Sequence, residues 1–305
     1  MNAGATQQEL LAKARAALAH IEGANAHQEA RILLEWAMGA DDLWTAPATL
    51  TRSQERRFHE ALARRCAREP LQHVVGRMWF RDLTLVARPG VFVTRPETEV
   101  VAGCAIDEAA RLAGESAGQG RPGPLVVDLC AGSGAIAIAV ATEVPSARVV
   151  AVEIDEDAAD LARTNIDALA PGRVDLVVGD ATSRSTLDLL EGGVDVVVSN
   201  PPYVPDREPV TQAEALVDPE RALYGGGEDG MVVPRGIVEV AWHLLAPGAL
   251  LVVEHASSQS REMRREARQR GYAEVRTLPD LTGRDRLLHA RRPLAPPPWD
   301  SSVDR

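Results

Sequence analysis

Apolar residues in the first part of the chain recur with a helical period. In residues 7–19 and 27–38, and again after Thr51, apolar positions fall three or four residues apart, as on one face of an amphipathic helix. Thr6 and Thr51 each lie three residues before a Glu or Gln, which is the spacing of a capping box at a helix N-terminus. The pattern therefore predicts a small N-terminal helical bundle.

The pattern changes in residues 71–95, where β-branched, aromatic and other apolar residues predominate. This composition predicts strands in a hairpin-like connector. A further helix is expected from about Glu97 to Leu112. Residues 114–124, rich in glycine and proline, are predicted to form a flexible loop.

From residue 125 onward, short apolar runs alternate with helical periods. The apolar runs predict strands at Leu125–Leu129, Arg148–Ile154, Val174–Val178, Val194–Ser199, Ala249–Glu254, Ala273–Thr277 and Leu287–Ala290. Helices are expected between most of them, at 156–169, 233–245 and 258–270. This alternation predicts an α/β fold, a doubly wound and mostly parallel Rossmann-like sheet of seven strands.

Two stretches interrupt this order. Residues 205–231 contain three consecutive glycines and are predicted to form a long loop beside the site described below. Residues 293–305 are rich in proline and are expected to be disordered. The predicted domains are a helical substrate-recognition domain at 1–70, the connector at 71–95, the α/β domain at 96–292 and the tail at 293–305.

Charge is unevenly distributed along the 305 residues, which carry a net charge of −11. Residues 1–90 sum to +2 and the remainder to −13, so the α/β domain is poorly suited to extended contact with a phosphate backbone. An arginine-rich stretch, residues 52–68, fits either an acidic or RNA-bearing partner or, as the preferred interpretation, a solvated helix face. No apolar stretch is long enough to span a membrane and no signal pattern is present, so a cytoplasmic protein is expected.

Cysteine and histidine positions indicate neither a disulfide framework nor a metal site. The three cysteines are widely spaced, and the seven histidines lack metal-ligand spacing. His255 follows Glu254 at the end of a predicted strand, where we favour a structural role over a catalytic one.

A strand, a glycine-rich turn and a helix follow one another from Val126 to Val140. Gly132 and Gly134 allow a tight turn and a close approach to a ligand, and Asp128 precedes the turn. Glu153, at the end of the next strand, is placed to accept hydrogen bonds from ribose hydroxyls. The turn also fits a dinucleotide fingerprint, but an acid on both strand ends favours an adenosyl ligand that carries an amino group.

The most informative segment is Asn200-Pro201-Pro202-Tyr203, directly after the apolar run Val194–Ser199. The prolines restrict the backbone, so the Asn side chain and nearby carbonyls are held at the carboxyl end of a strand. An amide oxygen and a carbonyl can accept both hydrogens of a planar –NH2 group, and the Tyr ring can lie against its plane. The segment predicts a site that holds an amide or an exocyclic amine while its nitrogen attacks an electrophile.

With these motifs the chain resembles the HemK-like (PrmC) N5-glutamine methyltransferases. The similarity extends from about residue 27 to 291. It is carried by Glu29–Leu34, Arg68–His73, Thr94–Glu99, Asp128–Gly134, Glu153, Ser199–Tyr203 and Asp280–Arg286. The chain departs from the usual family pattern at Cys130, where Gly is common, at Glu153, where Asp is common, and at Asp218, where Glu is common.

The resemblance implies an enzyme that uses S-adenosylmethionine to methylate the glutamine of the Gly-Gly-Gln loop in class I peptide-chain release factors. It implies catalytic roles for Asn200, Pro201 and Tyr203, with Pro202 also contacting the substrate. The expected cofactor-binding residues are Asp128, Cys130, Ala131, Gly132, Ser133, Gly134, Glu153, Asp180, Ala181 and Asn200. A monomer without stable nucleic-acid binding is expected.

Three alternatives remain at this point. A related enzyme could modify a glutamine in another protein. An exocyclic-amine methyltransferase acting on adenine or guanine shares the Asn-Pro-Pro-aromatic motif. A non-catalytic binding module could retain only cofactor binding, although the intact motif argues against it.

Overall fold

A computed structural model describes residues 5–120, 122–209 and 213–294 of the chain. The chain divides into two compact units. The first unit comprises the described residues of 1–77, 87–89 and 210–217, and the second comprises those of 78–86, 90–209 and 218–305. The predicted tail lies almost wholly outside the described residues.

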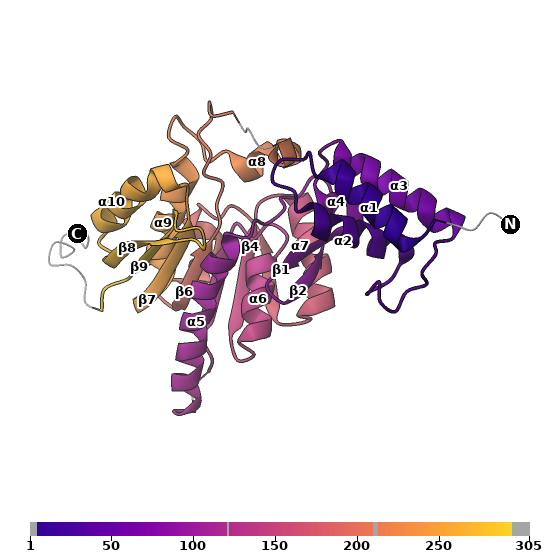
Figure 1. The fold of residues 1–305 in the computed structure, drawn as a ribbon. Helices are drawn as coiled ribbons and strands as arrows, with labels where there is room; N and C mark the ends of the chain where they lie inside the picture. Colours follow the sequence, from indigo (N-terminus) through magenta and orange to yellow (C-terminus); the bar gives the residue numbers. More distant parts are fainter. Residues whose placement is uncertain (1–4, 121, 210–212, 295–305) are drawn as a thin grey trace. The chain divides into compact units, whose positions relative to one another are not determined.

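The first unit is the expected small helical bundle (Figure 1). Its helices are α1 (Gln7–Leu18), α2 (Ala26–Met38), α3 (Arg52–Cys66) and α4 (Leu71–Val75). Both predicted capping boxes are present, so α1 and α3 begin where the sequence indicated. Their apolar stripes meet in one core that includes Leu10, Leu33, Leu34, Phe58 and Leu62.

Arg65 corrects the interpretation of the arginine-rich stretch as a solvated face. Its side chain is only 4% exposed and pairs with Glu29 of α2 at 2.6 Å and with Glu214 at 3.1 Å. Glu214 lies in the short helix η3 (Ala213–Val217), far along the chain but within this same unit, and also pairs with Arg68 at 2.9 Å. Removing one member of a buried ion pair leaves an unpaired buried charge, so Arg65 is a structural residue of the first unit.

Residues 71–95 contain the expected hairpin in a narrower form. Its strands are β1 (Arg77–Phe80) and β2 (Leu83–Val86), which form a separate two-stranded sheet. Val74 and Val75 were expected in a strand but belong to α4, because Pro70 begins a helical turn and Gly76, with φ of 69°, ends it. Residues 91–93 lie outside any strand.

The second unit is built on a seven-stranded sheet in the order β5-β4-β3-β6-β7-β9-β8. The predicted doubly wound α/β fold is therefore confirmed. Among these seven strands, β9 runs in the direction opposite to the other six. The strands are β3 (Leu125–Leu129), β4 (Arg148–Glu153), β5 (Val174–Val178), β6 (Val194–Ser199), β7 (Leu245–Glu254), β8 (Ala273–Pro279) and β9 (Asp285–Arg291).

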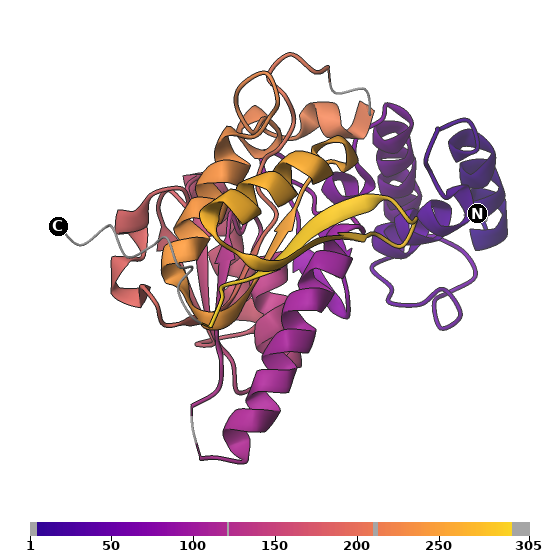
Figure 2. The same ribbon diagram turned by 90° about the vertical axis from the view of Figure 1, so that its left-hand side faces the viewer.

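Helices cover both faces of this sheet. Three of them, α5 (Thr98–Ala117), α6 (Ala135–Glu143) and α7 (Glu156–Leu169), follow one another across one face. The opposite face carries α9 (Val232–Leu244) and α10 (Ser260–Arg270), which pack on each other (Figures 1 and 2). Short turns of helix are η1 (Arg184–Thr186), η2 (Asp188–Leu190), α8 (Glu220–Leu223) and η4 (Ser257–Gln259).

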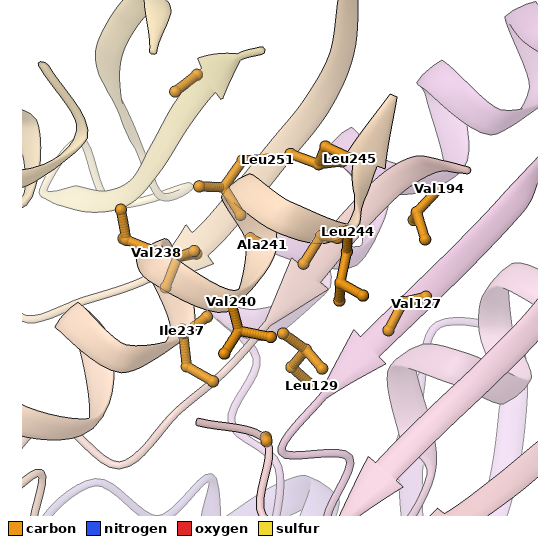
Figure 3. Close-up of a cluster of buried hydrophobic side chains, with 14 of the residues drawn as sticks. Val127, Leu129, Val194, Ile237, Val238, Val240, Ala241, Leu244, Leu245 and Leu251 are labelled. Atoms are coloured by element: carbon orange, nitrogen blue, oxygen red, sulfur yellow. The ribbon is translucent and has the colours of Figure 1, made fainter. Parts of the chain in front are cut away.

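One large core cluster lies between the sheet and the helices α9 and α10. Val127, Leu129 and Val194 of the strands meet Ile237 and Leu244 of the helix, and all are buried (Figure 3). The central strands are buried on both faces, which explains why they read as continuous apolar runs instead of alternating ones.

One predicted boundary is wrong. α5 continues through Gly114 to Ala117, into the stretch expected to be a loop, because Arg111 pairs with Glu115 one turn later. Residues 205–231, predicted to form a long loop-rich stretch, contain the short helices η3 and α8 among the described residues. Within the described residues, none of the helices is both long and apolar enough to cross a membrane.

Candidate functional site

Three neighbouring strands bring the predicted site segments to one edge of the sheet. Leu129 at the end of β3 is in register with Val152 of β4 and Ser199 of β6. The Ser199 hydroxyl donates to the Leu129 carbonyl at 2.6 Å, which ties the two strand ends together. The glycine-rich turn, Glu153 and Asn200 therefore all start from the carboxyl end of the sheet, where open α/β folds bind ligands.

The turn after β3 runs through left-handed backbone at Cys130, Gly132 and Gly134, with φ of 65°, 56° and 83°. A Cβ on Gly132 would meet nothing within 4 Å, so this turn faces open space. A Cβ on Gly134 would lie 3.3 Å from Ile138 Cδ1, so this glycine also lets α6 pack closely. Cys130 takes a conformation that costs a non-glycine residue about 1–2 kcal/mol, which accounts for the glycine common in the family at this position. Burial raises the pKa of the Cys130 thiol well above its usual range, so it is not a nucleophile at neutral pH.

Asp128 is fully buried beneath this turn. Its Oδ2 accepts a hydrogen bond from the Ala137 amide at 3.0 Å, while Oδ1 has no partner among the described residues. Burial, assisted by the charge of Glu153, raises the pKa of Asp128 to about 8. The Ser133 hydroxyl is also buried without a partner in the described chain. Unsatisfied buried polar atoms are rare, and two of them belong to this strand and its turn, which fits a site for a ligand that brings its own hydrogen-bonding groups.

Glu153 is held firmly at the rim of the site. Its Oε2 accepts from the Gly132 amide at 2.7 Å and its Oε1 from the Asp155 amide at 2.8 Å. Each carboxylate oxygen retains a second lone pair, so the pair of oxygens can still accept from two ribose hydroxyls. The neighbouring apolar side chains Ile154 and Val178 are about half exposed (47% and 49%) and offer a surface for a flat ring.

Asp180 and Ala181 follow the end of β5, the strand beside Glu153. The Asp180 carboxylate is exposed and accepts from the amide and hydroxyl of Thr182 through one oxygen. Ala181 is buried in the core, so only its backbone is placed to contact a ligand. Together with the turn and Glu153, the chain offers a donor and acceptor set that fits S-adenosylmethionine.

Asn200 stands with its amide in a defined orientation. Its Nδ2 donates to the Thr98 hydroxyl at 3.1 Å. Within the described residues, neither Asn200 Oδ1 nor the Pro201 carbonyl accepts a hydrogen bond from the protein. Two acceptors at adjacent residues are thus available to one planar –NH2 group.

Tyr203 is fixed through its hydroxyl, which donates to Glu254 Oε1 at 3.2 Å. Burial and the neighbouring Glu254 charge raise the pKa of Tyr203 above its usual range, so the hydroxyl keeps its proton. Glu254 itself is 2% exposed and also accepts from Thr98 at 2.7 Å.

The backbone of the motif rests against residues 223–230, which the sequence placed beside the site. The amides of Tyr203 and Val204 both donate to the Leu223 carbonyl. Gln259, 5% exposed, donates from Nε2 to the Tyr203 carbonyl at 2.7 Å and to the Asp229 carbonyl at 2.9 Å. These contacts leave little freedom to the segment that carries Tyr203.

His255 has a different environment. It is fully buried, its Nδ1 lies 2.9 Å from the Ala256 carbonyl, and burial lowers its pKa. A neutral ring held by its own neighbour fits the structural role favoured from the sequence.

Comparison with known proteins agrees with this geometry. Residues 9–76 match the family model of the PrmC N-terminal domain, and residues 82–239 match that of the methyltransferase small domain. A release factor glutamine methyltransferase from Streptomyces coelicolor is 46% identical over 243 residues, which cover 79% of this chain and 82% of that protein. The corresponding protein of Bifidobacterium longum is 44% identical over 240 residues, 76% of this chain and 79% of the relative. The chain belongs to the release factor glutamine methyltransferase family.

Membership in the release factor glutamine methyltransferase family confirms the resemblance, the enzyme class and the S-adenosylmethionine cofactor inferred from the sequence. Another relative has a name that refers to a different substrate. A 4-amino-L-phenylalanine/4-methylamino-L-phenylalanine methyltransferase from Streptomyces pristinaespiralis is 42% identical over 204 residues, 67% of this chain and 66% of that protein.

Thr98, Glu254 and Gln259 are the site residues that the sequence did not identify. Thr98 lies inside Thr94–Glu99, which was recognised as a signature of the release factor glutamine methyltransferase family without a role for this residue. Glu254 was noted only as the end of a strand. All three act through contacts with residues more than 50 positions away.

Cofactor selectivity provides a direct check of the turn and Glu153. We expect S-adenosylmethionine or its demethylated product to bind with a micromolar Kd in calorimetry, and NAD not to bind. Glu153→Ala removes the carboxylate expected to accept from the ribose hydroxyls and should weaken binding by roughly 10-fold or more, since a hydrogen bond to a charged group contributes about 1.5–3 kcal/mol. Glu156→Ala, an exposed acid in the first turn of α7, is the matched control and should bind normally. NAD binding in place of S-adenosylmethionine would contradict this assignment.

Proposed function

We propose that this protein transfers the methyl group of S-adenosylmethionine to the side-chain amide nitrogen of a glutamine, the one in the Gly-Gly-Gln loop of class I peptide-chain release factors. The observation that carries the proposal is the Asn200 amide, whose nitrogen is engaged by Thr98 and whose oxygen is available beside the Pro201 carbonyl. When bound, S-adenosylmethionine supplies an electrophilic methyl group.

The amide nitrogen of glutamine is a poor nucleophile because its lone pair is delocalised into the carbonyl. Catalysis therefore depends on positioning and on local electrostatics. Asn200 Oδ1 and the Pro201 carbonyl accept the two N–H hydrogens and so fix the plane and direction of the –NH2 group. Pro202 keeps this backbone rigid, and the Tyr203 ring packs on the amide plane. No strong base is required, because an amide nitrogen that has gained a methyl group while still holding both hydrogens loses one readily to water.

The cofactor-binding assignments belong to the same proposal. The Asp128 carboxyl lies below the turn, with an oxygen free to accept from the cofactor amino group. Glu153 accepts from the ribose hydroxyls. The remaining proposed contacts are Cys130, Ala131, Gly132, Ser133, Gly134, Asp180, Ala181 and Asn200.

A second candidate substrate is an aromatic amine. The same two acceptors can hold any planar –NH2 group, and the relative that methylates 4-amino-L-phenylalanine is 42% identical to this chain. The glutamine assignment has broader support, because the relatives named release factor glutamine methyltransferase match over a larger share of the chain. The acidic α/β domain disfavours adenine or guanine in nucleic acid.

The test is methyl transfer from labelled S-adenosylmethionine to four acceptors. These are a class I release factor, the same factor with the Gly-Gly-Gln glutamine replaced by alanine, free 4-amino-L-phenylalanine, and mixed DNA and RNA. We expect label only in the unmodified factor, at the side-chain nitrogen by mass spectrometry. Label in the amine or in nucleic acid, with none in the factor, would overturn the proposed substrate.

The division of labour along the chain is also proposed. A glutamine side chain is small and common, so selection of one glutamine needs a second surface, for which residues 1–70 are the candidate. Residues 71–95 connect it to the catalytic domain at 96–292. We further propose a monomer located in the cytoplasm, without stable nucleic-acid binding.

Exposed arginines of α3 provide a check on substrate recognition. Arg57 lies over the Trp36 ring at 4.7 Å and Arg65 is buried, so neither is suitable for such a test. Arg52 and Arg56 are exposed. Replacing both with alanine should raise the KM for intact release factor by roughly 3–10-fold with kcat nearly unchanged, because the lost contacts act equally on ground and transition states.

The matched control replaces two exposed arginines of α10, Arg261 and Arg268, and should leave KM unchanged. Steady-state kinetics with intact release factor measure both values. A normal KM in the Arg52 and Arg56 double variant would remove this surface from the recognition model.

A further inference from the structure

Four polar side chains form one continuous chain of hydrogen bonds beneath the substrate segment. Asn200 Nδ2 donates to Thr98 Oγ1 at 3.1 Å, and Thr98 Oγ1 donates to Glu254 Oε2 at 2.7 Å. The other oxygen of Glu254 accepts from the Tyr203 hydroxyl at 3.2 Å. The members come from the start of α5, the end of β7 and the segment after β6, all within the second unit.

The chemistry of these groups fixes which atom donates and which accepts in each of these hydrogen bonds. An ionised carboxylate accepts hydrogen bonds and donates none, so Thr98 must give its single hydrogen to Glu254. The Thr98 oxygen then has only lone pairs left, and it can pair with the Asn200 amide only through Nδ2. Asn200 Oδ1 is therefore turned away from Thr98. An amide turned the other way would place Asn200 Oδ1 against Thr98 Oγ1 with no hydrogen between the two oxygens.

We propose that Thr98 and Glu254 are positioning residues that hold the Asn200 amide with its oxygen toward the substrate nitrogen. This inference rests on the proposed role of Asn200 Oδ1 as an acceptor for the glutamine –NH2 group. Neither residue needs to touch the substrate. Through Tyr203, Glu254 also fixes the ring that packs on the substrate plane. Both acceptor and ring thus depend on one buried carboxylate.

The charge of Glu254 controls the orientation of the Asn200 amide. Burial raises its pKa to about 7, and the negative charge of Glu97 adds to the rise. Hydrogen bonds from Thr98 and Tyr203 and the positive charge of Arg286 on β9 act in the opposite direction. A carboxyl with these surroundings gains its proton as the pH falls through about 7.

Two neighbouring groups complete the surroundings of this carboxylate. Arg286 is shared with Asp280, its partner at 3.3 Å, so its charge is only partly directed at Glu254. His255 follows directly in sequence, and because burial lowers its pKa it is neutral in this range.

Protonation of Glu254 removes this fixed order of donors and acceptors. The neutral carboxyl can donate to Thr98, and the Thr98 hydrogen is then free to turn toward Asn200. The Asn200 amide can now rotate and present –NH2 where the substrate needs an acceptor. The kcat should therefore reach its maximum well above pH 7 and should fall as the pH drops through about 7.

The experiment compares kcat, KM and cofactor Kd of the full chain and its variants, with kcat measured from pH 5.5 to 9. Thr98→Val keeps the shape and removes the hydroxyl, so kcat should fall roughly 10–100-fold with cofactor Kd within about twofold. Thr98→Ser restores the hydroxyl and should recover most of this loss. Thr142→Val, the same change on α6, is the matched control and should leave kcat unchanged.

Glu254→Gln is the second variant to test, because an uncharged amide neither fixes the order of donors and acceptors nor titrates. We expect kcat to fall about 10-fold at pH 8 and the decline near pH 7 to disappear. Wild-type kcat in Thr98→Val, or an unchanged acid limb in Glu254→Gln, would overturn the inference. If Thr98→Val does not fold, as judged by loss of cofactor binding, the pH profile of Glu254→Gln decides alone.

The role of Asn200 and the positioning role of Thr98 and Glu254 can be tested separately. If Asn200→Ala retains full activity, the proposed role of Asn200 fails and the positioning role fails with it. If Asn200→Ala is impaired while Thr98→Val and Glu254→Gln behave as wild type, only the positioning role is wrong.

Discussion

Asn200→Ala should lower kcat for release factor methylation by about 10²–10³-fold while the Kd for S-adenosylmethionine changes little. The variant removes one of the two acceptors proposed to orient the reacting –NH2 group, and loss of a single oriented hydrogen-bonding group at a reacting centre has effects of this size. Asn200 is also one of the proposed cofactor contacts, but most of the affinity should be retained because the other proposed contacts, at Gly132–Gly134, Asp128 and Glu153, remain intact. Single-turnover kinetics together with calorimetry measure the two quantities separately.

The control for this substitution is Asn25→Ala. Asn25 caps α2 by accepting from the Gln28 amide, and it lies in the first unit. Its loss should cost about 1 kcal/mol of stability and leave kcat unchanged. Wild-type turnover in Asn200→Ala would show that the glutamine amide is oriented by other groups.

Gly230→Ala should be one of the most damaging single substitutions in the second unit. A Cβ at this position would lie 2.2 Å from the Tyr203 carbonyl oxygen and 2.8 Å from the Pro205 nitrogen, both backbone atoms. The backbone at Gly230 has φ of 67°, which adds strain for any other residue. Left-handed strain and forced overpacking together should destabilise the protein by roughly 2–5 kcal/mol.

Function should suffer beyond stability, because the displaced atom is the carbonyl of Tyr203, which Gln259 also holds. Gly172→Ala is the matched control: its φ is 70°, and an added Cβ meets nothing within 4 Å. We expect only the strain cost of about 1–2 kcal/mol and normal kcat from the control. Thermal unfolding and kcat at a temperature where both variants are folded provide the comparison. Equal behaviour of the two variants would show that the segment can move away from Gly230 at no cost.

Local patterns were sufficient to predict most elements of the fold. Both capping boxes and all the strands of the sheet were found, because period and capping depend on residues a few positions apart. α4 was missed because its five residues include two valines, which favour strands. Gly114 was taken as the start of a loop, although the helix continues past it.

Arg65 shows how a signal in the sequence can be overlooked. It lies seven residues after Phe58 and three after Leu62, so it shares their buried face of α3. Its charge suggested solvent, but Glu29 and Glu214 supply the counter-charges. Glu214 is 149 residues away, and no local pattern reveals such a partner.

The candidate site also combines features that local motifs reveal with features that depend on residues distant in sequence. Asn200 and the glycine turn could be named because their chemistry is contained in short motifs. The orientation of the Asn200 amide could not, because it depends on Thr98 and Glu254, which are 102 and 156 residues from their respective partners. Only the fold brings them together.

The path of the chain after the motif limits how this enzyme can be recombined with its relatives. Soon after Tyr203 the chain leaves the second unit at Pro209, contributes η3 to the first unit, and returns at Asp218, which Arg95 holds at 2.5 Å. A chimaera that exchanges only residues 1–77 would set Glu214 against a foreign partner in place of Arg65 and Arg68. The exchangeable module is therefore discontinuous: grafting a new recognition unit requires the matching stretch 210–217 to travel with it.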